Sequence, residues 1–193
     1  MKILELLADG NETIELLTVV DYLRRADIKI DMVSTTGSKN LVTSHGVKYE
    51  ADYLLEEINP DDYDGVYIPG GTRGAESLRD NEKVIEIIKD FKRDEKLIAA
   101  ICAGPIVLDR AGVLHDKKVT SFPTIKEELQ DIGEYIDDDI VVTDGNITTS
   151  RGAAVTNYLA LRLIEIIKGK EAKNKVKYGT QHEAVEEYFD IEF

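Results

Sequence analysis

Cysteine and histidine are scarce in this sequence. Among its 193 residues there is a single cysteine, Cys102, and there are three histidines. One cysteine excludes an intramolecular disulfide and a multi-cysteine zinc site, so we expect no metal. The lack of disulfides suits a reducing compartment, and the apolar start of the chain is interrupted by Glu5 and Asp9, unlike a signal peptide. We therefore expect a cytoplasmic protein.

Long apolar runs and an excess of positive charge are also missing. No run of about 18 apolar residues is present, so no membrane span is expected. The chain has 24 Lys and Arg against 38 Asp and Glu, a formal net charge of −14, which disfavours binding to nucleic acid and to anionic lipid. Hydrophobic residues at 42% and charged residues at 32% are typical of a soluble globular protein. The length fits one domain, residues 1–193, with a core that needs no disulfide or metal.

Strand-like and helix-like segments alternate along the chain. This alternation favours a mostly parallel sheet covered by helices. Beyond Gly179 the tail is acidic yet contains Tyr188, Phe189 and Phe193, so we expect it to dock on the body or on a partner. The predicted strands are 2–7, 28–33, 65–68, 97–101 and 119–122; the helices are 14–25, 82–91, 103–111, 125–129 and 155–169; hairpins are expected within 41–49 and 140–149.

The segment AAICAGP at 99–105 is the strongest local signal for chemistry. An apolar strand runs into a turn of small residues and then into a helix, an elbow that exposes one side chain above the sheet edge. Cys102 would stand at the helix N-terminus, where the dipole and free N–H groups stabilise a thiolate. The alternative is that Cys102 is a small buried hydrophobic residue, as many free cysteines are.

A second small-residue turn, IPGGTRG at 68–74, follows another predicted buried strand. Its glycine pair would let backbone N–H groups face a ligand or a developing oxyanion. The alternative is a tight strand-to-helix turn without a role in chemistry. The Gly-Lys-Ser/Thr ending of a phosphate-binding P-loop is missing. Both turns are expected at the carboxyl edge of the same sheet.

The motifs AICAGP at 100–105, PGG at 69–71 with Gly74-Ala75, and TSRG at 149–152 together resemble the DJ-1/ThiJ/PfpI superfamily. The resemblance is strongest to the branch of the Parkinsonism-associated protein and its bacterial ThiJ-like relatives. It runs from Lys2 to about Lys175 and leaves 178–193 as a C-terminal extension. It implies a flavodoxin-like three-layer α/β sandwich, similar to class I glutamine amidotransferases, that forms a homodimer and uses no cofactor.

The resemblance also assigns roles to individual residues. It implies that Cys102 is the nucleophile and that Glu15 is a protonated carboxyl beside it, with a pKa raised by its partly buried surroundings. Without the resemblance, Glu15 would be interpreted as an exposed helix residue. Backbone amides of Gly70, Gly71 and Ala103 would hold an oxyanion.

Some positions depart from the family pattern. Phe122 stands where relatives with aldehyde chemistry usually carry a histidine, and phenylalanine cannot transfer protons. Ala103 stands where the PfpI-type proteases have a histidine, which argues against protease activity. His45 occupies the approximate place of an arginine that in relatives approaches the neighbouring subunit's active site; the alternative is a hairpin-turn residue. His115 and His182 are expected on the surface, as are the acidic runs Asp137–Asp139 and Glu186–Glu187.

Two functions remain open from the sequence. The first is a cysteine enzyme of the glutathione-independent glyoxalase or deglycase type, which acts on small aldehydes or other reactive carbonyls. The second is an oxidative-stress sensor or redox-regulated chaperone in which Cys102 is oxidised to a sulfinate. The loss of the histidine at Phe122 weakens the first and does not affect the second.

Overall fold

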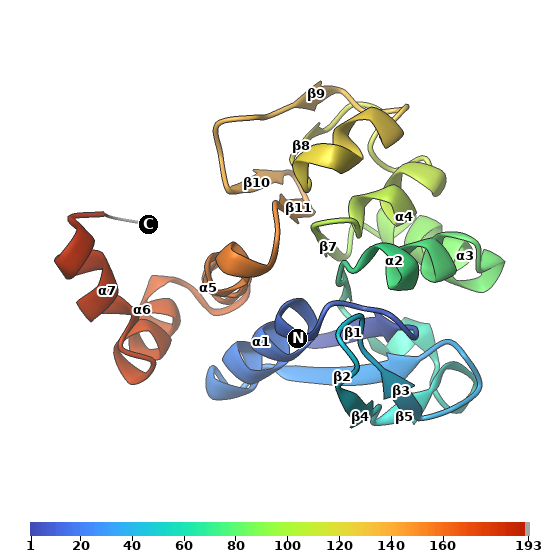
Figure 1. Ribbon diagram of the computed structural model, residues 1–193, viewed down its shortest axis with the longest axis horizontal. Coiled ribbons are helices and arrows are strands. Elements are labelled where there is room, and N and C mark those ends of the chain that lie inside the picture. Colours follow the sequence, from blue (N-terminus) through green and yellow to red (C-terminus); the bar gives the residue numbers. More distant parts are fainter. Residues whose placement is uncertain (192–193) are drawn as a thin grey trace.

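The centre of the structure is a seven-stranded sheet that is parallel except for an antiparallel strand at one edge (Figure 1). The computed structural model describes residues 1–191; residues 192–193, with Phe193 of the predicted tail, lie outside this part. The strands are β1 (Lys2–Leu7), β2 (Lys29–Ser34), β3 (Asn40–Val42), β4 (Lys48–Glu50), β5 (Tyr53–Leu54), β6 (Gly65–Ile68), β7 (Leu97–Ile101), β8 (Lys118–Val119), β9 (Glu134–Tyr135), β10 (Val141–Asp144) and β11 (Ile147–Ser150). The α-helices are α1 (Thr13–Arg25), α2 (Thr72–Arg79), α3 (Glu82–Arg93), α4 (Pro105–Arg110), α5 (Thr156–Lys168), α6 (Lys170–Gly179) and α7 (His182–Phe189). Short 3-10 helices cover Leu55–Glu57, Pro60–Asp62, Pro123–Glu128 and Ala153–Val155.

The order of the strands brings the predicted turns together. The sheet runs β10-β11-β7-β6-β1-β2-β5, so the chain leaves β1 toward β2 and later returns on the other side of β1 with β6. In open α/β sheets, ligands bind outside the carboxyl ends of the strands at such a reversal. The turns after β1, β6 and β7 therefore meet at one edge, and the predicted flavodoxin-like three-layer fold is confirmed.

Helices cover both faces of the sheet because the buried side chains of its strands alternate in direction. From β1, Leu4 and Leu6 join an apolar cluster with α2, α3 and α4, whereas Ile3 joins a second cluster with α1, α5 and α6. Figure 1 shows these two helical layers on opposite sides of the strands. Within residues 1–191, no helix has the length and apolar character needed to span a bilayer.

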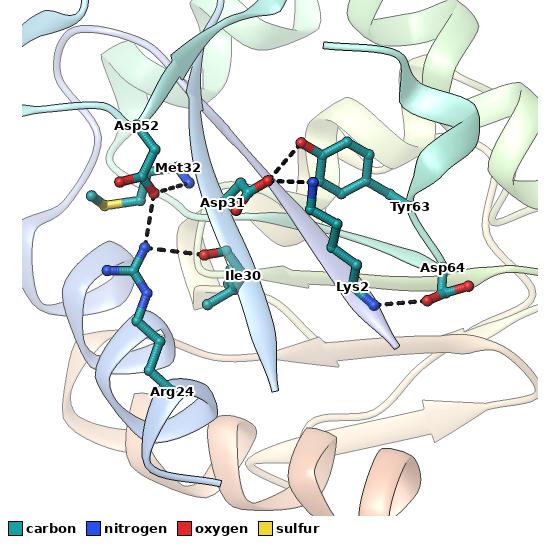
Figure 2. Close-up of polar contacts among 8 residues, drawn as sticks. All are labelled: Lys2, Arg24, Ile30, Asp31, Met32, Asp52, Tyr63 and Asp64. Carbon is teal, nitrogen blue, oxygen red and sulfur yellow. Dashed lines mark hydrogen bonds and ion pairs between the residues drawn. The ribbon is translucent and has the colours of Figure 1, made fainter. Parts of the chain in front are cut away.

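Polar contacts stabilise the end of the sheet that lies away from these turns, near the amino ends of its strands (Figure 2). The ammonium of Lys2 lies 2.7 Å from a carboxylate oxygen of Asp31, which also accepts the Tyr63 hydroxyl at 2.8 Å. Arg24, at the end of α1, donates to Asp52 at 2.8 Å. These contacts join β1 and β2 to neighbouring segments without using the carboxyl ends of the strands.

Glu5 is an exception to the apolar character of β1. It is paired in register with Met32 of β2 and Tyr67 of β6, and it is fully buried. Neither of its carboxylate oxygens has a hydrogen-bond partner among the described residues. Burial raises its pKa well above the usual glutamate value, with a smaller opposing effect from Arg24. Burial therefore favours the neutral, protonated form of this carboxyl more than it would be favoured at an exposed glutamate.

The C-terminal helices differ from the sequence-based expectation. The imidazole of His182 is only 5% exposed, with Nδ1 lying 3.2 Å from the side-chain amide of Asn157 and its ring against Tyr158. Glu186, one helical turn later, is 8% exposed and forms an ion pair of 2.6 Å with Lys177 of α6. The prediction that His182 and Glu186 lie on the surface is wrong, because α7 folds back on α5 and α6. Burial lowers the pKa of His182.

Two predicted elements are shorter than expected. The strand predicted over 119–122 ends at Val119, and the helix predicted from 103 begins at Pro105. Cys102 and the residues after it form a turn before α4. The hairpins β3-β4 and β10-β11 form as predicted. In the tail, Tyr188 and Phe189 remain exposed although α7 is docked on the body.

Candidate active site

Cys102 occupies a strained position directly after β7. Its φ of +61° lies in the left-handed region, which non-glycine residues rarely adopt. Its N–H donates to the carbonyl of Ser150 at the end of β11, and its own carbonyl accepts the N–H of Phe122 at 3.0 Å. Two neighbouring segments thus hold the elbow and leave the thiol only partly exposed.

Glu15 lies in the first turn of α1 and is fully buried. Its backbone N–H donates to the Glu12 carboxylate at 2.9 Å, and its carbonyl accepts the Tyr67 hydroxyl at 2.9 Å. One carboxyl oxygen, Oε2, accepts the N–H of Gly70 at 2.8 Å. The other, Oε1, has no well-aligned hydrogen-bond partner among residues 1–191. The Gly70 amide therefore fixes the position of the carboxyl.

The glycine pair after β6 permits the close approach of these groups. A Cβ at Gly70 would lie 2.5 Å from Glu15 Oε2 and 2.6 Å from Cys102 Cβ, so only glycine fits between them. Gly71 has a φ of +80° and also has no room for a side chain. The N–H groups of Gly71 and Ala103 face the sulfur. The N–H of Gly70 is directed at Glu15 instead, so this amide positions the acid.

The carboxyl and the thiol shift each other's pKa. Burial raises the pKa of Glu15 to about 7, although hydrogen bonding to Cys102 and Gly70 acts in the other direction. Burial, and then the charge of Glu15, raise the pKa of the Cys102 thiol to about 12, against the effect of the Gly71 and Ala103 amides. This direction is opposite to the sequence-based expectation of a thiolate favoured by the helix N-terminus. With this pKa the thiol keeps its proton at neutral pH, so a base has to accept the proton when the sulfur attacks a substrate.

The position of the missing histidine lies beside the elbow. The backbone N–H of Phe122 donates to the Cys102 carbonyl, and the Phe122 ring lies about 3.4 Å from where a Cβ of Gly152 would be. The side chain is 44% exposed. The residue whose backbone is bonded to Cys102 therefore has no titratable side-chain proton.

The histidines do not gather around Cys102. His45 is exposed in the β3-β4 turn, where its ring nitrogen contacts the Ser44 hydroxyl at 3.0 Å. His115 is exposed and lies 2.6 Å from Asp131, which raises its pKa. His182 is buried between α5 and α7. Among the described residues, no three His, Cys, Asp or Glu side chains lie together as metal ligands would.

One positioning residue was missed by the sequence analysis. Asn11 is fully buried; its side-chain oxygen accepts the N–H of Ala8 at 2.7 Å and its amide donates to the Gly70 carbonyl at 2.9 Å. It thereby joins the turn after β1 to the turn after β6, and so sets the spacing of Glu15 and Gly70. Its place after a buried strand, in Asp9-Gly10-Asn11, predicted only a turn.

Known proteins resemble this chain over most of its length. A model of the DJ-1/PfpI family matches residues 1–166. Protein dj-1beta of Drosophila melanogaster is 36% identical over 176 residues, covering 91% of this chain and 94% of the relative. A Thermococcus kodakarensis protein named Deglycase TK1284 is 38% identical over 152 residues, covering 78% of this chain and 90% of the relative.

Solved structures agree with the sequence comparisons. The crystal structure of Drosophila melanogaster DJ-1beta superposes with a TM-score of 0.90 at 35% identity, covering 94% of this chain and 98% of that one. Toxoplasma gondii DJ-1, oxidized, superposes with a TM-score of 0.88 at 32% identity, covering 93% of this chain and 97% of that one. The family predicted from three motifs is confirmed, and the chain belongs to the DJ-1/PfpI family.

Proposed function

We propose that this protein is a cysteine-dependent enzyme that converts reactive α-oxoaldehydes into hydroxy acids without glutathione. The observation that carries the proposal is a buried carboxyl with a pKa of about 7 beside the Cys102 thiol, whose sulfur faces the backbone amides of Gly71 and Ala103. A base with a pKa near the working pH is efficient in proton transfer. The related protein named a deglycase supports chemistry on carbonyl compounds.

The first step would generate the nucleophile. The Glu15 carboxylate takes the thiol proton as the sulfur attacks the aldehyde carbon of the substrate, which forms a C–S bond and a hemithioacetal. The negative charge that develops on the former carbonyl oxygen would be stabilised by backbone N–H groups at the elbow, of which Gly71 and Ala103 are the candidates.

The later steps would move protons within the bound substrate. Glu15 first returns the thiol proton to the alkoxide, which completes the hemithioacetal and restores the carboxylate. The carboxylate then removes the hydrogen of the former aldehyde carbon and returns a proton to the adjacent carbon through an enediol, which leaves a thioester. Water then hydrolyses the thioester and releases the hydroxy acid and the free thiol. One substrate carbon is oxidised and its neighbour reduced, so no external oxidant is consumed. Phe122 cannot share this proton transfer, and we therefore expect slow turnover.

Methylglyoxal provides the test of this function. The protein is expected to convert methylglyoxal to lactate slowly. C102S is expected to abolish the conversion, because a serine hydroxyl is a far weaker nucleophile than a cysteine thiol. Lactate is measured enzymatically, and circular dichroism verifies the fold of the variant. Wild-type turnover in C102S would contradict the mechanism.

A redox sensor is the second candidate, favoured by the amides that face the sulfur. Peroxide would oxidise the Cys102 thiolate to a sulfenate and then a sulfinate, releasing one water at each step. The N–H groups of Gly71 and Ala103 and a protonated Glu15 would donate to the sulfinate oxygens. Intact-mass measurement after peroxide treatment separates the candidates: a stable gain of two oxygen atoms, without methylglyoxal turnover, would favour the sensor.

We also propose that the protein forms a homodimer. Ile14 and Leu17 of α1 are 52% and 40% exposed, and Val42 and Val47 of the hairpin are 40% and 45% exposed. A hydrogen bond of 2.8 Å between the Thr13 and Thr43 hydroxyls joins the two elements, so these side chains belong to one region of the surface.

Light scattering is expected to give twice the chain mass of 21.6 kDa. The reason is that pairing removes these apolar side chains from water. In such a dimer, His45 of this hairpin would approach the neighbouring active site. A mass equal to one chain would contradict the pairing.

A further inference from the structure

A cavity of about 510 Å³ opens beside the active site, between the turn after β1, the β3-β4 hairpin and the start of α2. Gly71, whose N–H faces the sulfur of Cys102, is followed directly by Thr72 and Arg73, and both of these line the cavity. The cavity therefore begins one residue away from the amide that faces the nucleophile. Its lining is formed by Asp9, Gly10, Val42, Thr43, Ser44, Thr72 and Arg73.

Arg73 brings an unpaired positive charge to this cavity. Among residues 1–191, its guanidinium has no ion pair or hydrogen bond, in contrast to Arg79 at the end of the same helix, which lies 2.8 Å from Asp80. The aliphatic part of the Arg73 side chain packs against Gly10. If Gly10 carried a Cβ atom, that atom would lie 3.0 Å from Cβ and 3.3 Å from Cδ of Arg73. The arginine side chain thus packs along the turn after β1, and its guanidinium has no bonding partner within residues 1–191.

The other polar groups of the cavity are mostly engaged. One carboxylate oxygen of Asp9 accepts the N–H of Val42 at 2.8 Å, and the Thr43 hydroxyl is bonded to Thr13. The guanidinium, in contrast, has all of its donors available within residues 1–191. A planar guanidinium binds carboxylate and phosphate oxygens in a forked geometry.

We infer that Arg73 determines substrate specificity, by binding the anionic group of a small carbonyl compound whose carbonyl carbon reaches Cys102. The inference rests on the proposed function, because it assumes that Cys102 is the reacting group. The substrate class that follows is an α-oxoaldehyde or related carbonyl with a carboxylate or phosphate substituent. This preference is opposite to what the net charge of −14 would give by itself.

Alkylation of the single cysteine tests the inference without requiring turnover. Iodoacetamide is neutral and iodoacetate carries a carboxylate; both form the same C–S bond with Cys102 and release iodide. The ratio of their rate constants, followed by intact mass at one mildly alkaline pH, cancels the thiolate fraction. We expect R73Q to lower the iodoacetate-to-iodoacetamide ratio about fivefold and to leave the iodoacetamide rate unchanged. The ratio in the wild type is expected to fall as salt is added.

R79Q is the matched control, since it changes the net charge equally but lies at the other end of α2. It is expected to leave the ratio at the wild-type value. An R73Q ratio equal to that of the wild type would overturn the inference. An equal fall in R79Q would also overturn it, because the effect would then come from overall charge.

Methylglyoxal turnover, measured on the same proteins, separates this inference from the proposed function. Methylglyoxal is neutral and has no anionic group for Arg73 to bind, so its turnover by the wild type tests the proposed function independently of the anion site. If the wild type fails to convert methylglyoxal while the alkylation ratio still depends on Arg73, the proposed function is wrong and the anion site stands. If turnover is present and the ratio does not depend on Arg73, the anion site is wrong and the proposed function stands.

Discussion

Replacing Glu15 with glutamine is expected to reduce methylglyoxal turnover at least about a hundredfold and, at the same time, to make Cys102 more reactive toward iodoacetamide. The two effects have one cause. In the wild type, burial and then the charge of Glu15 raise the pKa of the thiol to about 12. Glutamine has no charge and donates a hydrogen bond through its amide, so the thiol pKa falls in E15Q. The base that accepts the thiol proton is lost in the same change.

The pH profile makes this prediction specific. Glu15 has a pKa of about 7, so wild-type turnover should rise as the pH increases through about 7, where the carboxylate becomes available as a base. E15Q should lose this rise. E86Q, an exposed change in α3, serves as the matched control and should keep both turnover and profile. A variant E15Q with slower alkylation than the wild type would show that the carboxyl activates the thiol directly.

Replacing Glu5 with leucine is expected to stabilise the protein by about 2–4 kcal/mol at pH values above neutrality. Because burial raises the pKa of Glu5 in the folded state, the folded protein binds this proton more tightly than the unfolded chain does. Stability therefore decreases as the pH rises above the ordinary glutamate pKa, until the carboxyl ionises or the protein unfolds. E5L removes this pH-dependent loss of stability, so the difference in unfolding free energy between E5L and the wild type should become smaller in acid.

Urea unfolding of the wild type, E5L and E5Q, in acid and in mild alkali, would measure the effect. Glutamine is close to glutamate in shape and does not titrate. E5Q should therefore lose the pH dependence of stability but still be destabilised by an unpaired polar group buried at position 5. If E5L were less stable than the wild type in alkali, the carboxylate would be satisfied by groups that the described residues do not supply.

Much of the fold follows from local sequence patterns. The continuous apolar run of β7 and the helical spacing of the apolar residues in α3 are local signals, and tertiary contacts do not override them. The elbow and the glycine pair could be placed at one sheet edge because strand order in a doubly wound sheet brings such turns together. The assignment of Glu15 to the site needed the family resemblance, since a glutamate in the first turn of a helix is usually exposed.

Other features depend on contacts between distant segments. The burial of His182 is set by the packing of α7 on α5, which no local pattern around position 182 encodes. The raised pKa of Cys102 depends on its burial and then on the nearby charge of Glu15, across a turn that Gly70 keeps narrow. The uncommitted charge of Arg73 likewise appears only when the turn after β1 is placed beside α2.

The backbone of Cys102 has a consequence for how this site persists. At a φ of +61°, an L-amino acid costs roughly 1 kcal/mol relative to glycine, which adopts this conformation freely. Folding alone would thus be served better by glycine at position 102. If the thiol were not needed, replacing Cys102 with glycine would relieve this backbone strain. The cysteine is therefore kept for its thiol, although its backbone conformation favours glycine.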